Sequence, residues 1–404
     1  MFRRTLLTTA GAALAAPALL RSAWAADMPG VTKDEIKIGN TDAYSGPASA
    51  YGAIGRGHVA FFKRLNDQGG IGGRKINFIT YDDGYSPPKT VEQTRRLVEQ
   101  DGVAFTFNAL GTPTQSAVHR YMNQKKVPQV FVSSGADKWS QTKEFPWTIG
   151  WQPSYRTEGQ IYAKYILANK PDGKIAVLFQ NDDFGKDYLI GLKDGLGDKF
   201  DKMVINQSSY EVTDPTIDSQ AVAMKSSGAD VLVSAATPKF AAQIIRKIYE
   251  LDWKPLHLLT DVSISVNAVI NPAGPERATG LIAASYYKDN SDPQWKDDPG
   301  MNEWRDFMKQ YLPDAELSDS NYVFAYGVAT TCVQMLKQCG ADLSRENIMA
   351  QAKNLERHQP PTLIPGCYVS TGPTNAHPIR HMQLQRWNGK RWELFGDVIE
   401  GAGA

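Results

Sequence analysis

The chain has 404 residues, with 44 Lys and Arg against 43 Asp and Glu, a formal net charge of +1 and 42% hydrophobic residues. This length predicts two or three domains with sizeable cores, and the balanced charge argues against a nucleic-acid-binding protein, which usually carries a basic field. Three cysteines are too few for a disulfide scaffold, and beyond residue 30 no apolar run reaches the ~18–20 residues that span a bilayer.

The first 26 residues have the order of an export signal. Arg3 and Arg4 precede a mostly apolar stretch, and Ala23-Trp24-Ala25 places small residues at both positions of a cleavage site. We expect residues 1–26 to be a signal peptide that is cleaved after Ala25 or Ala26, leaving a soluble protein in a bacterial periplasm. The arginine pair is similar to a twin-arginine signal. Phe2 and Thr8 depart from that pattern, so general and twin-arginine export both stay open.

Short β-rich runs alternate with helical runs along the rest of the first 260 residues. The expected elements are a strand at 36–38, a helix at 54–65, a strand at 76–81, a helix from 87, a strand at 103–107, a helix at 115–123, and strands at 127–132 and 175–179; after these come a helix at 187–196, a strand at 203–210, a helix at 217–226, a strand at 230–235, a helix at 240–251 and a strand at 256–259. Two successive sets of βαβ units predict an α/β fold with two parallel sheets, each covered by helices on both faces.

The last third of the chain breaks this alternation. Helices are expected in succession at 301–311, 320–338 and 345–354, followed by strands around Tyr368, at 382–386 and at 392–395. No period of 20–50 residues repeats, which excludes a solenoid.

Catalytic motifs are missing from the sequence. The glycines of residues 52–57 lack the dinucleotide-binding spacing, and no nucleophile, base and orienting group occur together, so we expect no enzyme, no cofactor and no metal. Cys332 and Cys339 lie about 10.5 Å apart along one expected helix, too far for a disulfide. Cys367 could pair with either one, and the sequence leaves that choice open.

Two loops at strand ends are unusual. Residues 108–114 and 133–137 follow the third and fourth expected strands and are rich in Gly, Ser and Thr. Ligands of doubly wound sheets bind at such carboxyl ends, where free N–H groups, hydroxyls and a helix dipole can hold an anion. A carboxylate fits better than a phosphate ester, because the loops contain no Lys or Arg. Ordinary capping and turn formation is the alternative.

Several motifs together identify a family resemblance. They are Ile36-Lys37-Ile38-Gly39 with Ser45-Gly46-Pro47 and Tyr51-Gly52, then Asn66-x-x-Gly69-Gly70-Ile71-x-Gly73-Arg74-Lys75-Ile76 leading to Tyr81-Asp82-Asp83, and Asn181-Asp182-Asp183-Phe184-Gly185. Over nearly the whole mature chain the sequence resembles the type I periplasmic solute-binding proteins of ABC importers, of the branched-chain amino acid (Leu/Ile/Val) group.

The resemblance implies two doubly wound lobes with a cleft between them. Lobe 1 would combine residues 27–150 with 286–365, and lobe 2 would combine 151–285 with 366–404, with chain crossings near 148–153, 283–288 and 364–369. The implied ligand-binding residues are Tyr51, Leu110, Gly111, Thr112, Thr114, Ser133, Ser134, Gly135, Ala136, Phe184, Thr237 and Asp261. In amino acid binders an acidic residue holds the ligand's ammonium group, and Asp261 is the nearest candidate.

The implied function is delivery of a small carboxylate or amino acid to an ABC permease in the inner membrane by a monomer. The favoured ligand is a branched-chain or other amino acid. Tyr85 and Gly111 replace the family's disulfide cysteines, and the segments 135–139, 336–340 and 382–384 are similar to a subgroup that takes aromatic or aliphatic carboxylates, so that class stays open. A ligand-sensing regulator on the same fold is the alternative from another class, although such a protein would lack the export signal.

Overall fold

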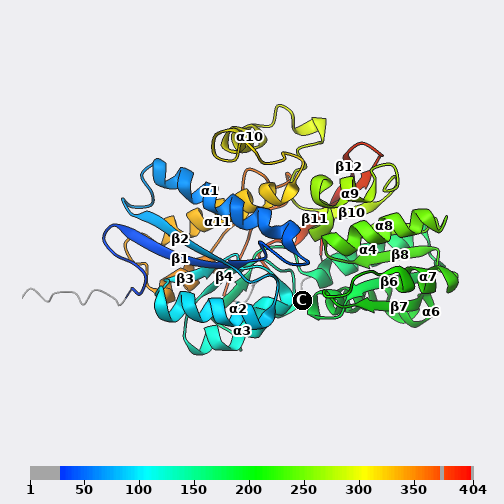
Figure 1. Ribbon diagram of the computed structural model, residues 1–404, viewed down its shortest axis with the longest axis horizontal. Coiled ribbons are helices and arrows are strands. Elements are labelled where there is room, and N and C mark those ends of the chain that lie inside the picture. The colour runs from blue at the N-terminus through cyan, green and yellow to red at the C-terminus, as the bar shows by residue number, and fades with distance from the viewer. Residues whose placement is uncertain (1–27, 374–376, 402–404) are drawn as a thin grey trace, which may run out of the picture.

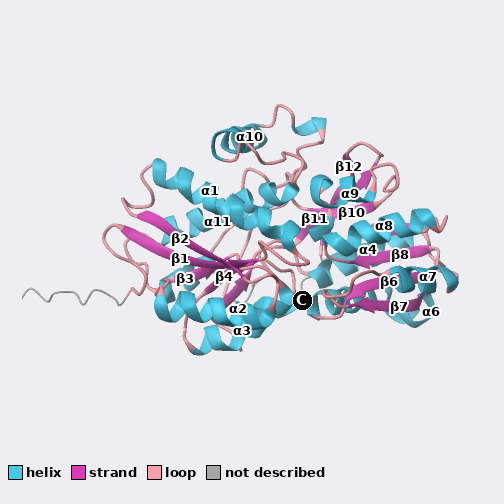
Figure 2. Cartoon of the chain, viewed as in Figure 1, coloured by secondary structure: helices cyan, strands magenta, loops and turns pink. Residues whose placement is uncertain are grey.

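The computed structural model describes residues 28–373 and 377–401, which form two sheets, each flanked by helices (Figures 1 and 2). The expected signal peptide therefore lies outside the described residues. Within residues 28–373 and 377–401, no helix is both long and apolar enough to cross a membrane. We use "first lobe" for the sheet of β1–β5 with α1–α3 and α10–α12, and "second lobe" for the sheet of β6–β12 with α4–α9.

The first sheet has the strand order β2-β1-β3-β4-β5, and every neighbouring pair is parallel. Its strands are β1 (Glu35–Asp42), β2 (Lys75–Asp82), β3 (Phe105–Phe107), β4 (Gln129–Val132) and β5 (Thr148–Gly150). The helices of this lobe are α1 (Gly52–Asp67), α2 (Pro87–Arg95), α3 (Thr112–Gln124), α10 (Pro299–Tyr311), α11 (Ser320–Cys339) and α12 (Arg345–Ala352). β3, β4 and β5 are buried at every position, as expected for parallel strands covered on both faces.

The second sheet has the strand order β12-β11-β10-β9-β8-β6-β7. Its strands are β6 (Ile175–Gln180), β7 (Val204–Tyr210), β8 (Val231–Ala235), β9 (Leu256–Leu259), β10 (Ile282–Ser285), β11 (His381–Trp387) and β12 (Trp392–Glu400). β11 and β12 pair antiparallel at one edge, β11 also runs antiparallel to β10, and the other strands are parallel. The helices are α4 (Tyr155–Asn169), α5 (Asp183–Leu196), α6 (Phe200–Met203), α7 (Asp218–Ser226), α8 (Pro238–Glu250) and α9 (Asn271–Ala273).

The glycine pair after α1 shows how a sequence motif fixes a turn. Gly69 and Gly70 have φ values of 106° and 76°, a region that glycine enters without steric cost. The Gly70 N–H donates to the Leu65 carbonyl at 2.9 Å, and a Cβ on Gly70 would lie 1.9 Å from the Arg74 carbonyl oxygen. The turn into β2 therefore requires glycine at position 70.

The helices that interrupt the βα alternation belong to the first lobe. α10 and α11 pack on α1, and α12 packs on α11. Most residues of α11 are buried, so this helix is an internal element of the lobe. The chain then returns to the second sheet as β11 and β12, seen in orange and red in Figure 1. The α/β prediction with two doubly wound lobes is confirmed, whereas the residue limits of the lobes stay a prediction.

Two sequence expectations need correction at the C-terminal end. No strand forms around Tyr368, where the described backbone makes only an isolated bridge between His358 and Val369. The prolines of this segment have no N–H group to donate to a neighbouring strand. β12 extends to Glu400, beyond the expected range of 392–395. It is an edge strand whose later residues are only partly buried, so those residues do not form the apolar run that marks a buried strand in the sequence. All three cysteines are free thiols and buried, which answers the open disulfide question.

Candidate functional site

A cavity lies where the carboxyl ends of both sheets face each other. The side chains leave about 40 Å³ that the centre of a water-sized molecule can occupy, and about 520 Å³ of space between atoms when the open mouth is included. The lining residues come from both lobes and from the first and second chain crossings: Tyr51, Ile54, Tyr85, Leu110, Gly111, Ser133, Gln152, Tyr155, Phe184, Thr237, Asp261, Val262, Tyr286, Tyr287, Asn321 and Phe324.

The first-lobe wall is built around the N-terminus of α3. Gly111 is the N-cap with φ 102°, and a Cβ there would lie 2.5 Å from Thr114 Oγ1 and from the Tyr85 ring. The Gly111 N–H donates to the Ser133 carbonyl at 3.0 Å, which joins the two loops that the sequence singled out. The N–H groups of Leu110, Gly111 and Ser133 all donate to carbonyls of the protein, so this wall offers a ligand the Ser133 hydroxyl and the positive end of the α3 dipole, which favours an anion.

Seven of the twelve expected site residues line the cavity: Tyr51, Leu110, Gly111, Ser133, Phe184, Thr237 and Asp261. The structure does not place the other five, Thr112, Thr114, Ser134, Gly135 and Ala136, on the cavity wall. They are buried, and their polar groups bond to protein. The Thr112 and Ser134 hydroxyls contact each other at 2.7 Å, and the Thr114 hydroxyl donates to the Leu110 carbonyl.

Gly135 and Ala136 also shape the loop from behind. The Gly135 carbonyl accepts the Tyr155 N–H at 2.8 Å, and Ser134 Oγ accepts the Ala136 N–H at 3.2 Å. A Cβ on Gly135 would lie 2.5 Å from the Pro153 carbonyl oxygen. These residues therefore hold the first-lobe loop against the first chain crossing.

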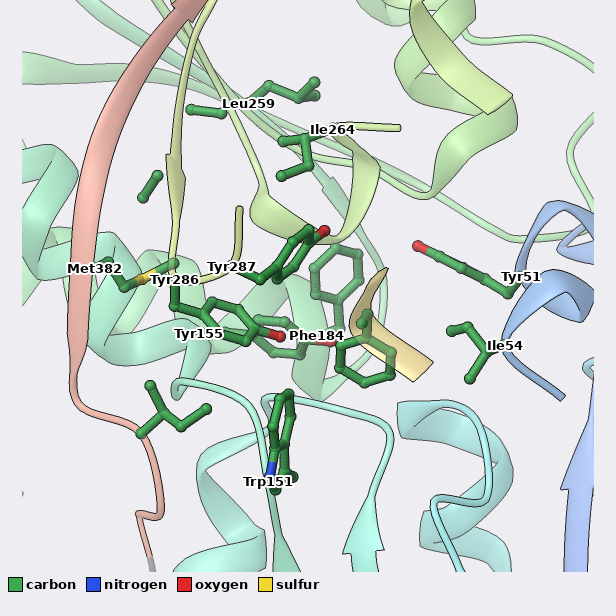
Figure 3. Close-up of a cluster of buried hydrophobic side chains, with 14 of the residues drawn as sticks. Tyr51, Ile54, Trp151, Tyr155, Phe184, Leu259, Ile264, Tyr286, Tyr287 and Met382 are labelled. Atoms are coloured by element: carbon green, nitrogen blue, oxygen red, sulfur yellow. The ribbon is translucent and has the colours of Figure 1, made fainter. Parts of the chain in front are cut away.

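Seven aromatic rings make up much of the cavity wall. Figure 3 shows Tyr51 and Ile54 approaching from one side, and Tyr155, Phe184, Tyr286 and Tyr287 clustered opposite them. The Tyr155 and Phe184 ring centroids are 4.7 Å apart, and those of Tyr286 and Tyr287 are 5.0 Å apart. Burial raises the pKa of each of the five lining tyrosines above its ordinary value, so these side chains are neutral phenols at neutral pH.

The second-lobe wall carries a buried carboxyl group, Asp261, which is 2% exposed. It follows β9 and begins a short 3-10 turn. Burial raises the pKa of Asp261 to about 6, while contacts to Glu158, the Val262 N–H and Thr260 lower it. The lining set contains no Lys, Arg or His. Asp261 is thus the one carboxylic acid of the set, and it has no cationic partner within it.

Polar contacts between the lobes flank the cavity on two sides. Beside α5, Lys138 Nζ lies 2.8 Å from Asp183 Oδ2, and the Asp137 N–H donates to Asp187 Oδ2 at 2.7 Å. On the other side, Ser265 Oγ donates to Asp319 Oδ1 at 2.9 Å. The structure is therefore a closed arrangement, in which both lobes contact each other around the site.

Sequence reasoning missed nine lining residues: Ile54, Tyr85, Gln152, Tyr155, Val262, Tyr286, Tyr287, Asn321 and Phe324. Four of them lie within two residues of an expected crossing or inside it: Gln152, Tyr155, Tyr286 and Tyr287. A chain that crosses between lobes passes along the cleft, so the expected crossings were a usable signal. Asn321 and Phe324 lie near the N-terminus of α11, which carries no local binding motif.

Two sheets whose carboxyl ends enclose one ring-lined cavity define a two-lobed ligand-binding protein. The sequence profile of the family described as "Periplasmic binding protein" matches residues 35–391. The chain belongs to that family, and the resemblance inferred from its motifs is confirmed.

The relatives agree with this assignment. A Leu/Ile/Val-binding protein homolog 1 from Brucella suis is 25% identical over 355 residues, covering 85% of this chain and 86% of the relative. Among solved structures, a branched-chain amino acid ABC transporter protein from Thermus thermophilus with bound valine has a TM-score of 0.80 at 16% identity, covering 92% of this chain and 98% of the other. A fatty acid ABC transporter substrate-binding protein from Thermomonospora curvata has a TM-score of 0.76 at 20% identity, covering 92% and 94%. The two structures show that the fold is shared.

Proposed function

We propose that this protein is the substrate-binding component of an ABC importer and closes its two lobes on one apolar α-amino acid of the branched-chain type. The observation that carries the proposal is the polarity of the cavity. A helix N-terminus forms the first-lobe wall, Asp261 lies on the second-lobe wall, and aromatic rings surround the space between them. The names of the Leu/Ile/Val-binding relatives support the same ligand class.

Each wall suits one end of an amino acid. The Ser133 hydroxyl can donate to a carboxylate, and the positive end of the α3 dipole favours negative charge there. An ammonium group that enters a closed cavity needs a counter-charge, because burying it unpaired is costly. Asp261 supplies that charge when it is ionised. The rings would then bury the ligand's side chain.

A second candidate ligand is an aromatic or aliphatic carboxylic acid. The density of rings in the wall favours it, since stacking and apolar burial could replace the ammonium contact. Such a ligand would bind best with Asp261 protonated, because a second negative charge in the cavity repels a carboxylate.

Calorimetry of the parent protein and Asp261→Asn separates these two ligands. With L-leucine, the substitution is expected to abolish binding, because the ammonium group loses its counter-charge. With 4-hydroxybenzoate, it is expected to leave binding intact or strengthen it. A parent protein that binds benzoates and ignores every amino acid would contradict the amino acid proposal.

The proposed transport role also implies a cellular location and a protein partner. We propose that residues 1–26 direct export to the periplasm, that the mature protein is a monomer, and that it delivers its ligand to a permease in the inner membrane. The lobes would be residues 27–150 with 286–365 and residues 151–285 with 366–404, closing about the three crossings. The family to which the chain belongs supports this proposal.

A further inference from the structure

We propose that Glu158 is a neutral, protonated carboxylic acid that positions the Asp261 loop, so that Asp261 alone presents a charge to the ligand from the second lobe. Glu158 lies in the first turn of α4 and is 1% exposed. It does not line the cavity. Nothing in its position along the sequence marks it as part of the site.

The contacts of Glu158 join three elements behind the cavity wall. Glu158 Oε1 accepts the backbone N–H of Asp261 at 2.9 Å and lies 2.5 Å from the Tyr162 hydroxyl on α4. Glu158 Oε2 contacts the Tyr188 hydroxyl from α5, which in turn lies 2.6 Å from Thr260 Oγ1. Residues 260 and 261 are therefore held by Glu158 both directly and through Tyr188.

The number of hydrogens at Tyr162 indicates which form of Glu158 is present. The Tyr162 oxygen lies 2.5 Å from the Leu259 carbonyl oxygen and 2.5 Å from Glu158 Oε1, and it accepts the Ala284 N–H at 3.0 Å. A phenol has one hydrogen to donate, and a carbonyl has none. If Tyr162 donates to Leu259, the contact with Glu158 requires a hydrogen on the carboxyl group. An ionised Glu158 would leave two oxygens pressed together without a proton between them.

The charges around Glu158 favour the same form. The titratable groups that face it are Tyr162 and, from α5, Tyr188, together with Asp261 after β9 and Tyr286 after β10. Burial and the neighbouring Asp261 carboxyl raise the pKa of Glu158 well above its ordinary value. Two ionised carboxylates buried away from water would repel each other, so the pair holds one proton, and the hydrogen-bond geometry places it on Glu158.

The consequence for the site is a fixed and single negative charge. Glu158 holds the Asp261 backbone while adding no charge of its own, so an ammonium ligand would meet one carboxylate of defined position. This last step rests on the proposed amino acid function, whereas the protonation of Glu158 does not.

Infrared difference spectroscopy of the ligand-free protein tests the protonation state. At pH 7.5, the parent-minus-Glu158→Gln difference spectrum is expected to contain the carbonyl stretch of a protonated carboxylic acid, which the variant lacks. Glu92→Gln, the same change at an exposed position on α2, should instead remove a carboxylate band. Loss of a carboxylate band from Glu158→Gln overturns the proposal.

A second measurement does not depend on a variant that folds. In parent protein labelled with ¹³C at the glutamate carboxyl carbons, one resonance should keep the chemical shift of a protonated acid at pH 7.5. A spectrum in which every glutamate carboxyl is ionised at that pH overturns the proposal.

The positioning role is tested with L-leucine. Glu158→Ala removes the acceptor of the Asp261 N–H and is expected to weaken binding by more than about tenfold. Glu158→Gln keeps a neutral acceptor and should bind at least about fivefold more tightly than Glu158→Ala. Equal losses in the two variants would contradict positioning. A parent protein that binds no amino acid would contradict the proposed function alone, because the infrared result needs no ligand.

Discussion

Gly111 is the residue at which the binding loop has least room. Its φ is 102°, and a Cβ added to it would lie only 2.5 Å from Thr114 Oγ1, so Gly111→Ala is predicted to displace the N-terminus of α3. We expect strain and overpacking of roughly 1–3 kcal/mol, with loss of ligand affinity measured by calorimetry.

Gly69→Ala is the matched control for this change. Gly69 has a φ of 106° and no atom within 4 Å of an added Cβ, so it carries the backbone strain without a clash. Both variants should have a lower Tm, and only Gly111→Ala should bind ligand more weakly. Equal ligand affinity in the two variants would contradict a role for Gly111 in ligand binding.

Asp261 also sets a pH dependence at the residue scale. Because its pKa is about 6 in the closed structure, the carboxylate that an ammonium needs is lost as the pH falls through 6. Leucine affinity is expected to fall about tenfold for each pH unit below that value. Titrations at pH 5, 6 and 7.5 check this, and an affinity that rises toward pH 5 would favour the carboxylic acid ligand.

At the same scale, sequence reasoning located loops better than side chains. Leu110, Gly111 and Ser133 line the cavity, whereas Thr112 and Thr114 bond back into the protein, and the part that each plays in ligand binding stays a prediction. A hydroxyl near a helix N-terminus can serve a ligand or the backbone, and composition does not distinguish these roles. Glu158 escaped notice because its partners outside α4 lie 30 to 103 positions away along the chain.

At the scale of elements, α5 carries a pH-sensitive contact between the lobes. Burial raises the pKa of Asp187 to about 7, from an ordinary value of 3.8, although the Asp137 N–H lowers it. The folded state therefore binds an extra proton between those values, and its stability decreases as the pH rises from about 4 to 7.

Asp187→Asn should remove this pH-dependent decrease in stability, because the amide oxygen still accepts the Asp137 N–H and no charge is buried. We expect the variant to gain Tm relative to the parent at pH 8 and to gain less at pH 5, measured by thermal shift. Asp183→Asn, which breaks the contact with Lys138 one turn away, is the control and should not raise Tm at either pH. A Tm for Asp187→Asn below the parent value at pH 8 would contradict the argument.

Most elements could be predicted because their signal is local. α1, α3 and α8 have apolar faces with helical spacing, and β6 and β8 are short buried runs. Element limits were less accurate where capping decides them. α5 begins at Asp183 rather than at 187, because the Asp182 side chain accepts the Phe184 N–H at 3.0 Å. The predicted range of the edge strand β12 was too short, because its exposed residues do not show the alternation of apolar and polar residues that marks a half-buried strand.

At the scale of the whole molecule, lobe closure has a measurable size. The contacts of Lys138 with Asp183 and of Ser265 with Asp319 exist only while the lobes are together. Adding L-leucine should therefore lower the radius of gyration in small-angle X-ray scattering of the parent. Asp261→Asn with leucine should show no change, and a ligand-bound parent with an unaltered radius would contradict closure.

The start of the mature chain is a second prediction at this scale. Protein recovered from the periplasm should begin at Ala26 or Asp27 by N-terminal sequencing, because residues 1–25 have the order of charged, apolar and small residues that signal peptidase recognises. Intact Met1 on protein from the cytosol, under normal expression, would contradict export.

The burial of all three thiols has a practical consequence for studying this protein. Cys332 and Cys367 are 0% exposed and Cys339 is 6% exposed, so the native chain offers little to a thiol-reactive dye. Lys186 lies exposed on α5, one residue from the inter-lobe contact of Asp187. A cysteine introduced there would be the most accessible thiol, and a fluorophore attached to it would turn the closing of the lobes into an optical signal for identifying the ligand.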